Sequence, residues 1–296
     1  TERFTMYTIA GATGRVGAAA AHALIKDGAP VRVVVRKPAD AQQWVDRGAE
    51  AAVVDLTDRR GLTEALTGSA GFFTLLPFDP ATTDFHRDMR ELIASIAGAV
   101  TDSGVPHVTM LSSMGADLSE GTGPIVALHD LEVALRETPA VVSAVRPGHF
   151  QEKVADVLDT ARDEGIYPVF GASADVPKPA VATRDIGAVV APTLLNPPED
   201  HEAIDLDSPV YTEREIAGVL GRLLGRGLEV VTIPRQGWRD ALVGAGLSSS
   251  IAEVLVGLYE ADEHGVLQAR GDRSVTVHTG IEHTLARLLA VPAPAR

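Results

Sequence analysis

The fold of this chain is decided by the stretch Gly11-Ala12-Thr13-Gly14-Arg15-Val16-Gly17, which follows the short apolar run from Tyr7 to Ala10. An Ala-rich segment that suits a helix continues from about Arg15 to Lys26. Glycines at this spacing, between a strand and a helix, let the backbone turn tightly and approach a pyrophosphate at the helix N-terminus. We therefore predict that the loop binds a dinucleotide. The alternative is a turn that only caps the helix.

Strand-like and helix-like segments alternate along the first half of the chain. Val31 to Val35 is an unbroken β-branched run, as expected of a strand that is buried on both faces. Further strands are expected at 51–54, 70–76, 108–112 and 141–145, with helices at about 40–47, 85–103 and 128–137. Counting the strand before the glycine loop, this alternation predicts an α/β fold with a doubly wound parallel sheet of the Rossmann type.

Beyond Pro147 the alternation is less regular, with several prolines and glycines over 168–179. One more strand is expected at 181–186, and amphipathic helices at about 153–163, 213–225, 238–243 and 249–262. We predict a Rossmann domain over residues 1–150 and a smaller C-terminal α/β substrate lobe over residues 151–296. A segment near 181–190 is expected to return to the Rossmann sheet.

The composition excludes several classes of function. The formal net charge is −14, so the chain repels nucleic acid and anionic membranes, and no apolar stretch approaches the roughly 20 residues of a spanning helix. The chain has no cysteine, which excludes disulfides and thiolate chemistry and favours the cytoplasm. His278 and His283 lack a zinc-binding pattern, so no metal is expected. We expect a monomer or homodimer.

The end of the second strand favours one cofactor over another. NAD-binding proteins usually carry a carboxylate here for the ribose 2′-hydroxyl, whereas this chain has Arg36 and Lys37. Two cations favour a 2′-phosphate, and Arg15 is a third candidate ligand for it. We predict NADP(H), with NAD(H) as the alternative, unless the two cations are only solvated surface charges.

The next two strand ends supply further candidate cofactor contacts. Asp55 is placed to accept from the adenine amino group while Leu56 packs on the ring, or alternatively Asp55 is a helix N-cap. Leu75, Leu76 and Pro77 follow the fourth strand, where ligands of such sheets lie, although core packing alone explains the leucines.

The chain resembles the NmrA-like branch of the atypical short-chain dehydrogenase/reductase superfamily. That branch includes NADPH-dependent quinone oxidoreductases, isoflavone-reductase-like enzymes and NADP-sensing regulators. Besides the glycine loop, the resemblance rests on Val35-Arg36-Lys37, Leu111-Ser112-Ser113, Arg146-Pro147-Gly148-His149-Phe150, Thr183-Arg184-Asp185-Ile186 and Tyr211-Thr212-Glu213. It implies a Rossmann domain, a small C-terminal substrate lobe and a cleft between them.

The catalytic pattern of the superfamily is missing. Classical members use Tyr-x-x-x-Lys, but none of the four tyrosines here has a lysine four residues on. His129 stands near the position where reductases of the branch often keep a lysine, so we predict that it moves a proton or orients the substrate. Packing is the alternative. Ser112 is predicted to donate to the substrate or to the nicotinamide carboxamide, or else to satisfy strand-end backbone groups.

Phe78, Met114, His149 and Phe150 are expected to line an apolar site for a flat aromatic substrate, with His129 beside them. We therefore hypothesise an NADPH-dependent oxidoreductase that transfers hydride to a quinone or aromatic carbonyl compound, as in the tailoring of aromatic polyketides. The alternative is a regulator that senses NADP(H) without turnover.

Overall fold

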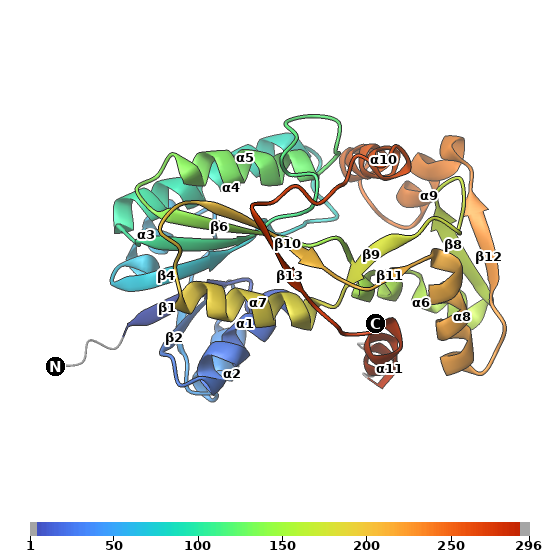
Figure 1. Cartoon of the computed structure of the whole chain (residues 1–296). Coiled ribbons are helices and arrows are strands. Elements are labelled where there is room, and N and C mark those ends of the chain that lie inside the picture. The colour runs from blue at the N-terminus through green and yellow to red at the C-terminus, as the bar shows by residue number, and fades with distance from the viewer. Residues whose placement is uncertain (1–4, 291–296) are drawn as a thin grey trace.

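The computed structural model describes residues 5–290, and a large parallel sheet is its central element (Figure 1). Eight strands lie in the order β3-β2-β1-β4-β5-β6-β10-β13, and every neighbouring pair is parallel. The strands are β1 (Met6–Ala10), β2 (Val31–Val35), β3 (Glu50–Val53), β4 (Ser69–Thr74), β5 (His107–Leu111), β6 (Val141–Arg146), β10 (Glu202–Asp207) and β13 (Arg273–Thr276). Successive strands are added outward on one side of β1 up to β3 and on its other side from β4 onward, so the strand order reverses between β1 and β4. This is the switch point where such sheets bind dinucleotides. The predicted doubly wound Rossmann sheet is confirmed, and β10 and β13 extend the expected six strands.

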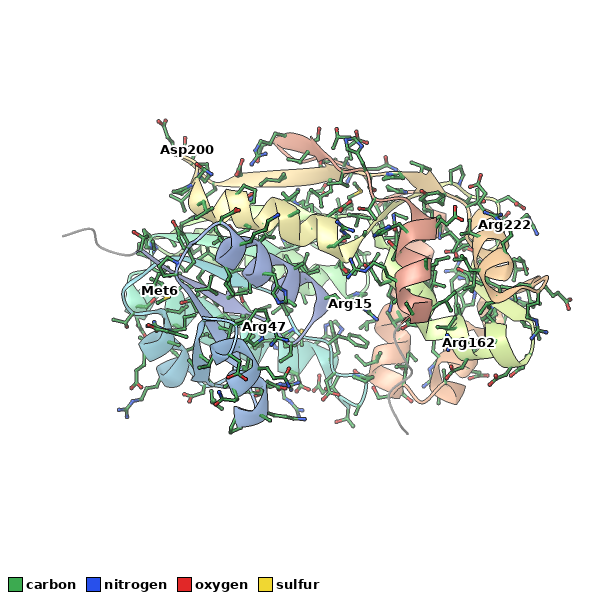
Figure 2. All side chains as sticks on the ribbon, turned by 90° about the horizontal axis from the view of Figure 1, so that it is seen from below. Met6, Arg15, Arg47, Arg162, Asp200 and Arg222 are labelled. Atoms are coloured by element: carbon green, nitrogen blue, oxygen red, sulfur yellow. The ribbon has the colours of Figure 1, made fainter. Side chains whose placement is uncertain are left out.

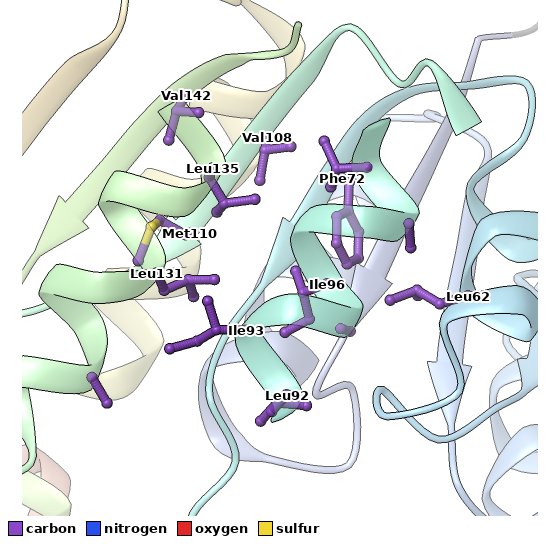
Figure 3. Close-up of a cluster of buried hydrophobic side chains, with 14 of the residues drawn as sticks. Leu62, Phe72, Leu92, Ile93, Ile96, Val108, Met110, Leu131, Leu135 and Val142 are labelled. Carbon is purple, nitrogen blue, oxygen red and sulfur yellow. The ribbon is translucent and has the colours of Figure 1, made fainter. Parts of the chain in front are cut away.

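Helices cover both faces of this sheet (Figure 1). One face carries α3 (Arg59–Leu66), α4 (Phe85–Ser103) and α5 (Ile125–Arg136), and the other carries α1 (Arg15–Lys26), α2 (Pro38–Val45) and α7 (Thr183–Leu195). Successive strand residues serve opposite faces: Phe72 belongs to the core under α4, and Phe73 to the core under α1. This explains the unbroken apolar runs. Figure 3 shows the first core, where Ile96 of α4 and Leu131 of α5 approach the strands.

The strand expected at 181–186 is wrong. Only Val181 lies in a strand, and Thr183 begins α7. Buried Ile186, Val189, Val190 and Leu194 repeat at helical spacing, which outweighs the β-propensity of Thr183 and Ile186. The segment therefore returns to the Rossmann part as a covering helix and not as a strand of the sheet.

A close helix contact explains this placement. A Cβ atom on Gly187 would lie 2.4 Å from the Cβ of Ala19 on α1, so only glycine lets α7 pack so tightly against α1.

The second lobe lies beyond the carboxyl ends of the first six strands (Figure 1). A three-stranded sheet has the order β11-β9-β7, and β12 pairs with β8. The strands are β7 (His149–Phe150), β8 (Ile166–Phe170), β9 (Lys178–Val181), β11 (Val210–Tyr211) and β12 (Glu229–Ile233). The helices are α6 (Leu158–Asp163), α8 (Glu213–Leu224), α9 (Trp238–Gly244), α10 (Ser249–Glu263) and α11 (Ile281–Ala290), with short 3-10 helices at Gln151–Val157 and Arg235–Gly237. Within residues 5–290, no helix has both the length and the apolar character needed to cross a membrane.

Candidate functional site

The glycine loop forms a tight cradle at the switch point of the sheet. Gly11 has φ +67°, a conformation that favours glycine, and its carbonyl oxygen accepts a hydrogen bond from Gly14 N at 2.9 Å. A Cβ atom on Gly17 would lie 2.3 Å from that oxygen. Gly14 is the N-cap of α1 and offers no side chain to the first N–H groups of the helix. These N–H groups therefore remain available to a phosphate, and the cradle fits the pyrophosphate of a dinucleotide.

Three cations lie on this side of the sheet. Arg15 begins α1, at the end of the helix that faces the second lobe (Figure 2). Arg36 and Lys37 follow β2 directly and are exposed. In the described part of the chain neither of these two forms an ion pair within 4 Å. Both side chains are thus free to pair with a 2′-phosphate.

Asp55 follows β3 and is held in an Asx turn. Its Oδ1 atom accepts from the Thr57 amide at 2.9 Å and from the Thr57 hydroxyl at 2.7 Å. These two hydrogen bonds, with a smaller contribution from the charge of Arg36, lower the pKa of Asp55 below its usual value. The N-cap of α3 is Asp58, which accepts from Gly61 N, so the N-cap alternative for Asp55 is wrong. The other carboxylate oxygen of Asp55 is left for an outside donor such as the adenine amino group.

The chain that leaves β4 runs beside the glycine loop. The Leu75 side chain lies 2.7 Å from the position of a Cβ on Gly11, so it packs directly on the cradle. Leu76 packs on the core under α4, and Leu56 packs there too. Pro77 is exposed, and Phe78 is 53% exposed. Phe78 is therefore an accessible aromatic surface at this edge of the sheet.

A buried ion pair lies behind the ends of β5 and β6, and sequence reasoning missed it. Arg146 donates to Glu132 through two bonds, of 2.9 and 2.6 Å, and both side chains are almost fully buried. Ser112 Oγ donates to the same carboxylate at 2.6 Å. The sequence did contain a signal for this pair, because Glu132 is an acid on the apolar face of a predicted helix and Arg146 is a base at the end of an apolar strand. The predicted site residue Ser112 is thereby fixed, and its hydroxyl proton is engaged by Glu132.

The two predicted histidines lie on different elements. His129 is half-buried on α5, and its Nδ1 atom lies 2.9 Å from the carbonyl oxygen of Ala116. His149 begins β7, and its Nε2 atom lies 3.1 Å from Oδ1 of Asp262 on α10. Lys178 of β9 bonds to the other oxygen of Asp262. Sequence reasoning missed both Asp262 and Lys178, since they are far from His149 along the chain.

The remaining predicted substrate residues lie along the same edge. Met114 is buried, and its amide donates to Pro147 O at 3.0 Å, so the chains leaving β5 and β6 run side by side. Phe150 is half-buried and packs on the core under α1 and α7. Met114 and His149 are brought to the same edge, whereas Phe150 is directed largely into the core.

Two other features of the described residues bear on the location of a site. A surface hollow of about 620 Å³ lies on α8 and the start of β12, lined by Arg214, Arg222 and Arg226, away from the glycine loop. Residues 5–290 contain no group of three or more His, Asp or Glu side chains arranged to hold a metal ion. The glycine cradle and the adjoining strand ends are therefore the candidate site.

Comparison with known proteins agrees with this geometry. Residues 5–284 match the NmrA-like family. The chain is 26% identical over 255 residues to an NAD(P)H azoreductase of Xenophilus azovorans, covering 86% of each protein. It is 25% identical to quinone oxidoreductase 2 of Escherichia coli K12, covering 84% of this chain and 85% of that protein. The crystal structure of an Escherichia coli NADPH-dependent quinone oxidoreductase with NADPH superimposes with a TM-score of 0.79 at 20% identity, covering 96% and 100%.

Proposed function

Because this chain belongs to the NmrA-like family, we propose that it is an NADPH-dependent reductase of quinones or related conjugated aromatic carbonyl compounds. The chain is an NAD(P)H-dependent oxidoreductase, as its azoreductase and quinone oxidoreductase relatives are. The observation that carries the finer proposal is the pairing of the glycine cradle with the unpaired cations Arg36 and Lys37.

The chain's own residues suffice to hold the cofactor. The first N–H groups of α1, with Arg15 beside them, would bind the pyrophosphate, and Gly17 lets the start of α1 pack closely on the backbone of Ala10 and Gly11. Arg36 and Lys37 would bind the 2′-phosphate. When bound, NADPH supplies a hydride from C4 of its nicotinamide ring.

The substrate side needs an apolar surface and a route for one proton. Phe78, which is 53% exposed, supplies an apolar surface at the strand ends, and a flat conjugated ring matches such a surface. A quinone makes a small demand on the protein, since the ring stabilises the hydroquinone anion. His129 remains a predicted orienting residue, because its Nδ1 atom is bound to the backbone while its ring stays half-buried.

The proposal is tested by following oxidation of NADPH and of NADH at 340 nm against quinones, azo dyes and aromatic polyketide ketones. We expect turnover with NADPH preferred, and the best acceptor identifies the substrate class, including any polyketide-tailoring role. His129→Ala measures the contribution of that residue, since an unchanged kcat removes it from the mechanism. The cysteine-free composition supports action in the cytoplasm.

A second candidate function is a sensor that binds NADP(H) without turnover. The observation that favours it is the lack of Tyr-x-x-x-Lys, together with the capture of the Ser112 hydroxyl by Glu132. Tight NADPH binding with no oxidation by any acceptor of the panel would select the sensor over the reductase.

A further inference from the structure

A histidine, a carboxylate and a lysine from three elements meet beside the end of β6. His149 of β7 contacts Asp262 of α10 at 3.1 Å, and Lys178 of β9 contacts the same carboxylate. The Asp262 side chain is 13% exposed and the Lys178 side chain 21%, whereas His149 is 38% exposed. The cluster therefore buries its carboxylate and presents its imidazole to the outside.

The Asp262 carboxylate determines which ring nitrogen of His149 carries a proton. Burial acts to raise the pKa of Asp262, but the hydrogen bond from His149 and the charge of Lys178 outweigh it and hold that pKa below its usual value. An ionised Asp262 accepts from Nε2–H of His149, which fixes the tautomer of the neutral ring. Only the imidazolium carries a second proton, on Nδ1. For that atom the described residues show no hydrogen-bond partner.

Several other groups that could donate a proton are engaged in hydrogen bonds. Ser112 Oγ donates to Glu132, and His129 Nδ1 is bound to a backbone carbonyl. Tyr167 donates to Glu213 at 2.9 Å, and burial raises its pKa far above the usual value. Of the two histidines, His149 is the one whose bound nitrogen faces a carboxylate, so we take it as the candidate donor.

His149 is placed to meet a substrate there. It lies three residues beyond the end of β6, at the carboxyl edge where ligands of such sheets bind. The hydrogen bond from Met114 N to Pro147 O keeps the loop after β5 against this segment. The partly exposed ring of His149 therefore lies beside the loop that leaves β5.

We propose that His149 is the proton donor of the reaction and that Asp262 and Lys178 are its positioning residues; this rests on the proposed function. The quinone gains two electrons and one proton equivalent as hydride from the dihydronicotinamide, which becomes the oxidised nicotinamide. The second proton passes from His149 Nδ1 to the hydroquinone oxygen. The ring keeps its Nε2 proton toward Asp262, and solvent returns a proton to Nδ1. The balance is one quinone, one reduced cofactor and one proton, giving the hydroquinone and the oxidised cofactor.

The test separates acceptors that need a proton from those that do not. A cationic triphenylmethane dye becomes neutral when it takes up hydride alone, whereas a quinone also needs a proton. We expect His149→Gln to lower kcat with the quinone roughly tenfold, below the usual 10²-fold for a general acid because the hydroquinone anion is stabilised by its ring. We expect dye reduction and the Kd for NADPH to stay within about twofold.

The outcomes are distinct. Equal losses of turnover with quinone and dye would mean that His149 only lines the substrate site. Unchanged quinone turnover would mean that His149 has no role in the reaction. If the wild-type protein does not reduce the dye, the role of His149 is tested by adding free imidazole to His149→Ala. Imidazole should restore quinone turnover only if the substitution removed a proton donor. His278→Gln, at an exposed histidine, is the matched control. If the wild-type protein reduces none of the acceptors tested, the proposed function itself is contradicted.

The positioning role has readouts that do not depend on turnover. Ring 15N NMR of the neutral histidine should place the proton on Nε2 in the wild-type protein, and Asp262→Asn should lose this preference. In kinetics, the pH above which quinone turnover declines should move down in Asp262→Asn and up in Lys178→Met, because the two charges act on the imidazolium with opposite sign. A tautomer and a pH profile that both variants leave unchanged would refute the role.

Discussion

The proposed cofactor side and the proposed substrate side of the strand ends are assembled in different ways. On the cofactor side, the glycine loop and Arg36 follow their strands directly and Asp55 lies two residues after β3, so chain connectivity alone places them along one edge. On the substrate side, Ser112 depends on Glu132, 20 positions away, and His149 depends on Asp262, 113 positions away. Strand-end positions can be predicted from a local pattern, whereas the second set requires the packed structure.

The strongest test of the substrate side removes its buried charge. Glu132→Gln leaves Arg146 buried without its partner, so we expect a loss of about 3–5 kcal/mol in the free energy of unfolding. Urea denaturation measures this loss. The control Glu64→Gln removes an exposed partner of Arg60 and should cost less than about 0.5 kcal/mol. Equal small losses in both variants would show that the buried pair does not hold the strand ends together.

A second long-range contact lies at the opposite end of β5 and gives a pH dependence. His107 is buried and bonds to Ser143 of β6, and burial lowers its pKa from 6.5 to about 4. Between these two values the unfolded chain binds a proton that the folded chain does not. This histidine therefore costs stability as the pH falls from 6.5 toward 4, by about 3 kcal/mol in total. Comparing unfolding of the wild-type protein and His107→Gln across this range should show the difference, and parallel curves would contradict it.

The cofactor side is tested by adding one carbon atom. The Cβ of Gly17→Ala would lie 2.3 Å from Gly11 O, so the loop must shift, and we expect about a 100-fold loss of NADPH affinity. NADPH fluorescence during titration measures it. Gly218→Ala is the control, since a Cβ there meets nothing within 4 Å and alanine favours the helix. Affinity that survives in Gly17→Ala would mean that the cofactor does not occupy the cradle.

The smallest expected effect concerns the choice between the two cofactors. Arg36→Glu should raise the KM for NADPH about tenfold and leave the KM for NADH nearly unchanged, because only NADPH carries a 2′-phosphate. Arg222→Glu alters the net charge equally but lies on α8, and it should change neither constant. Equal changes with both cofactors in Arg36→Glu would point to a general charge effect.

Particular residues show how far the sequence determines this molecule. The first six strands and the glycine cradle follow from apolar runs and glycine spacing, which report local backbone demands. The strand predicted at 181–186 ends at Val181, because Thr183 already begins α7, which packs closely on α1 at Gly187. Glu132 and Asp262 could not be assigned partners, since pairing at such separation depends on tertiary packing.

The most direct test of the central claim is a titration of the wild-type protein with NADPH and with NADH, following the fluorescence of the nicotinamide. If the cradle and the two cations after β2 bind the cofactor, NADPH should bind at least about tenfold more tightly than NADH, and 2′-phospho-ADP-ribose should compete with it. Equal affinities, or no binding of either nucleotide, would contradict the account.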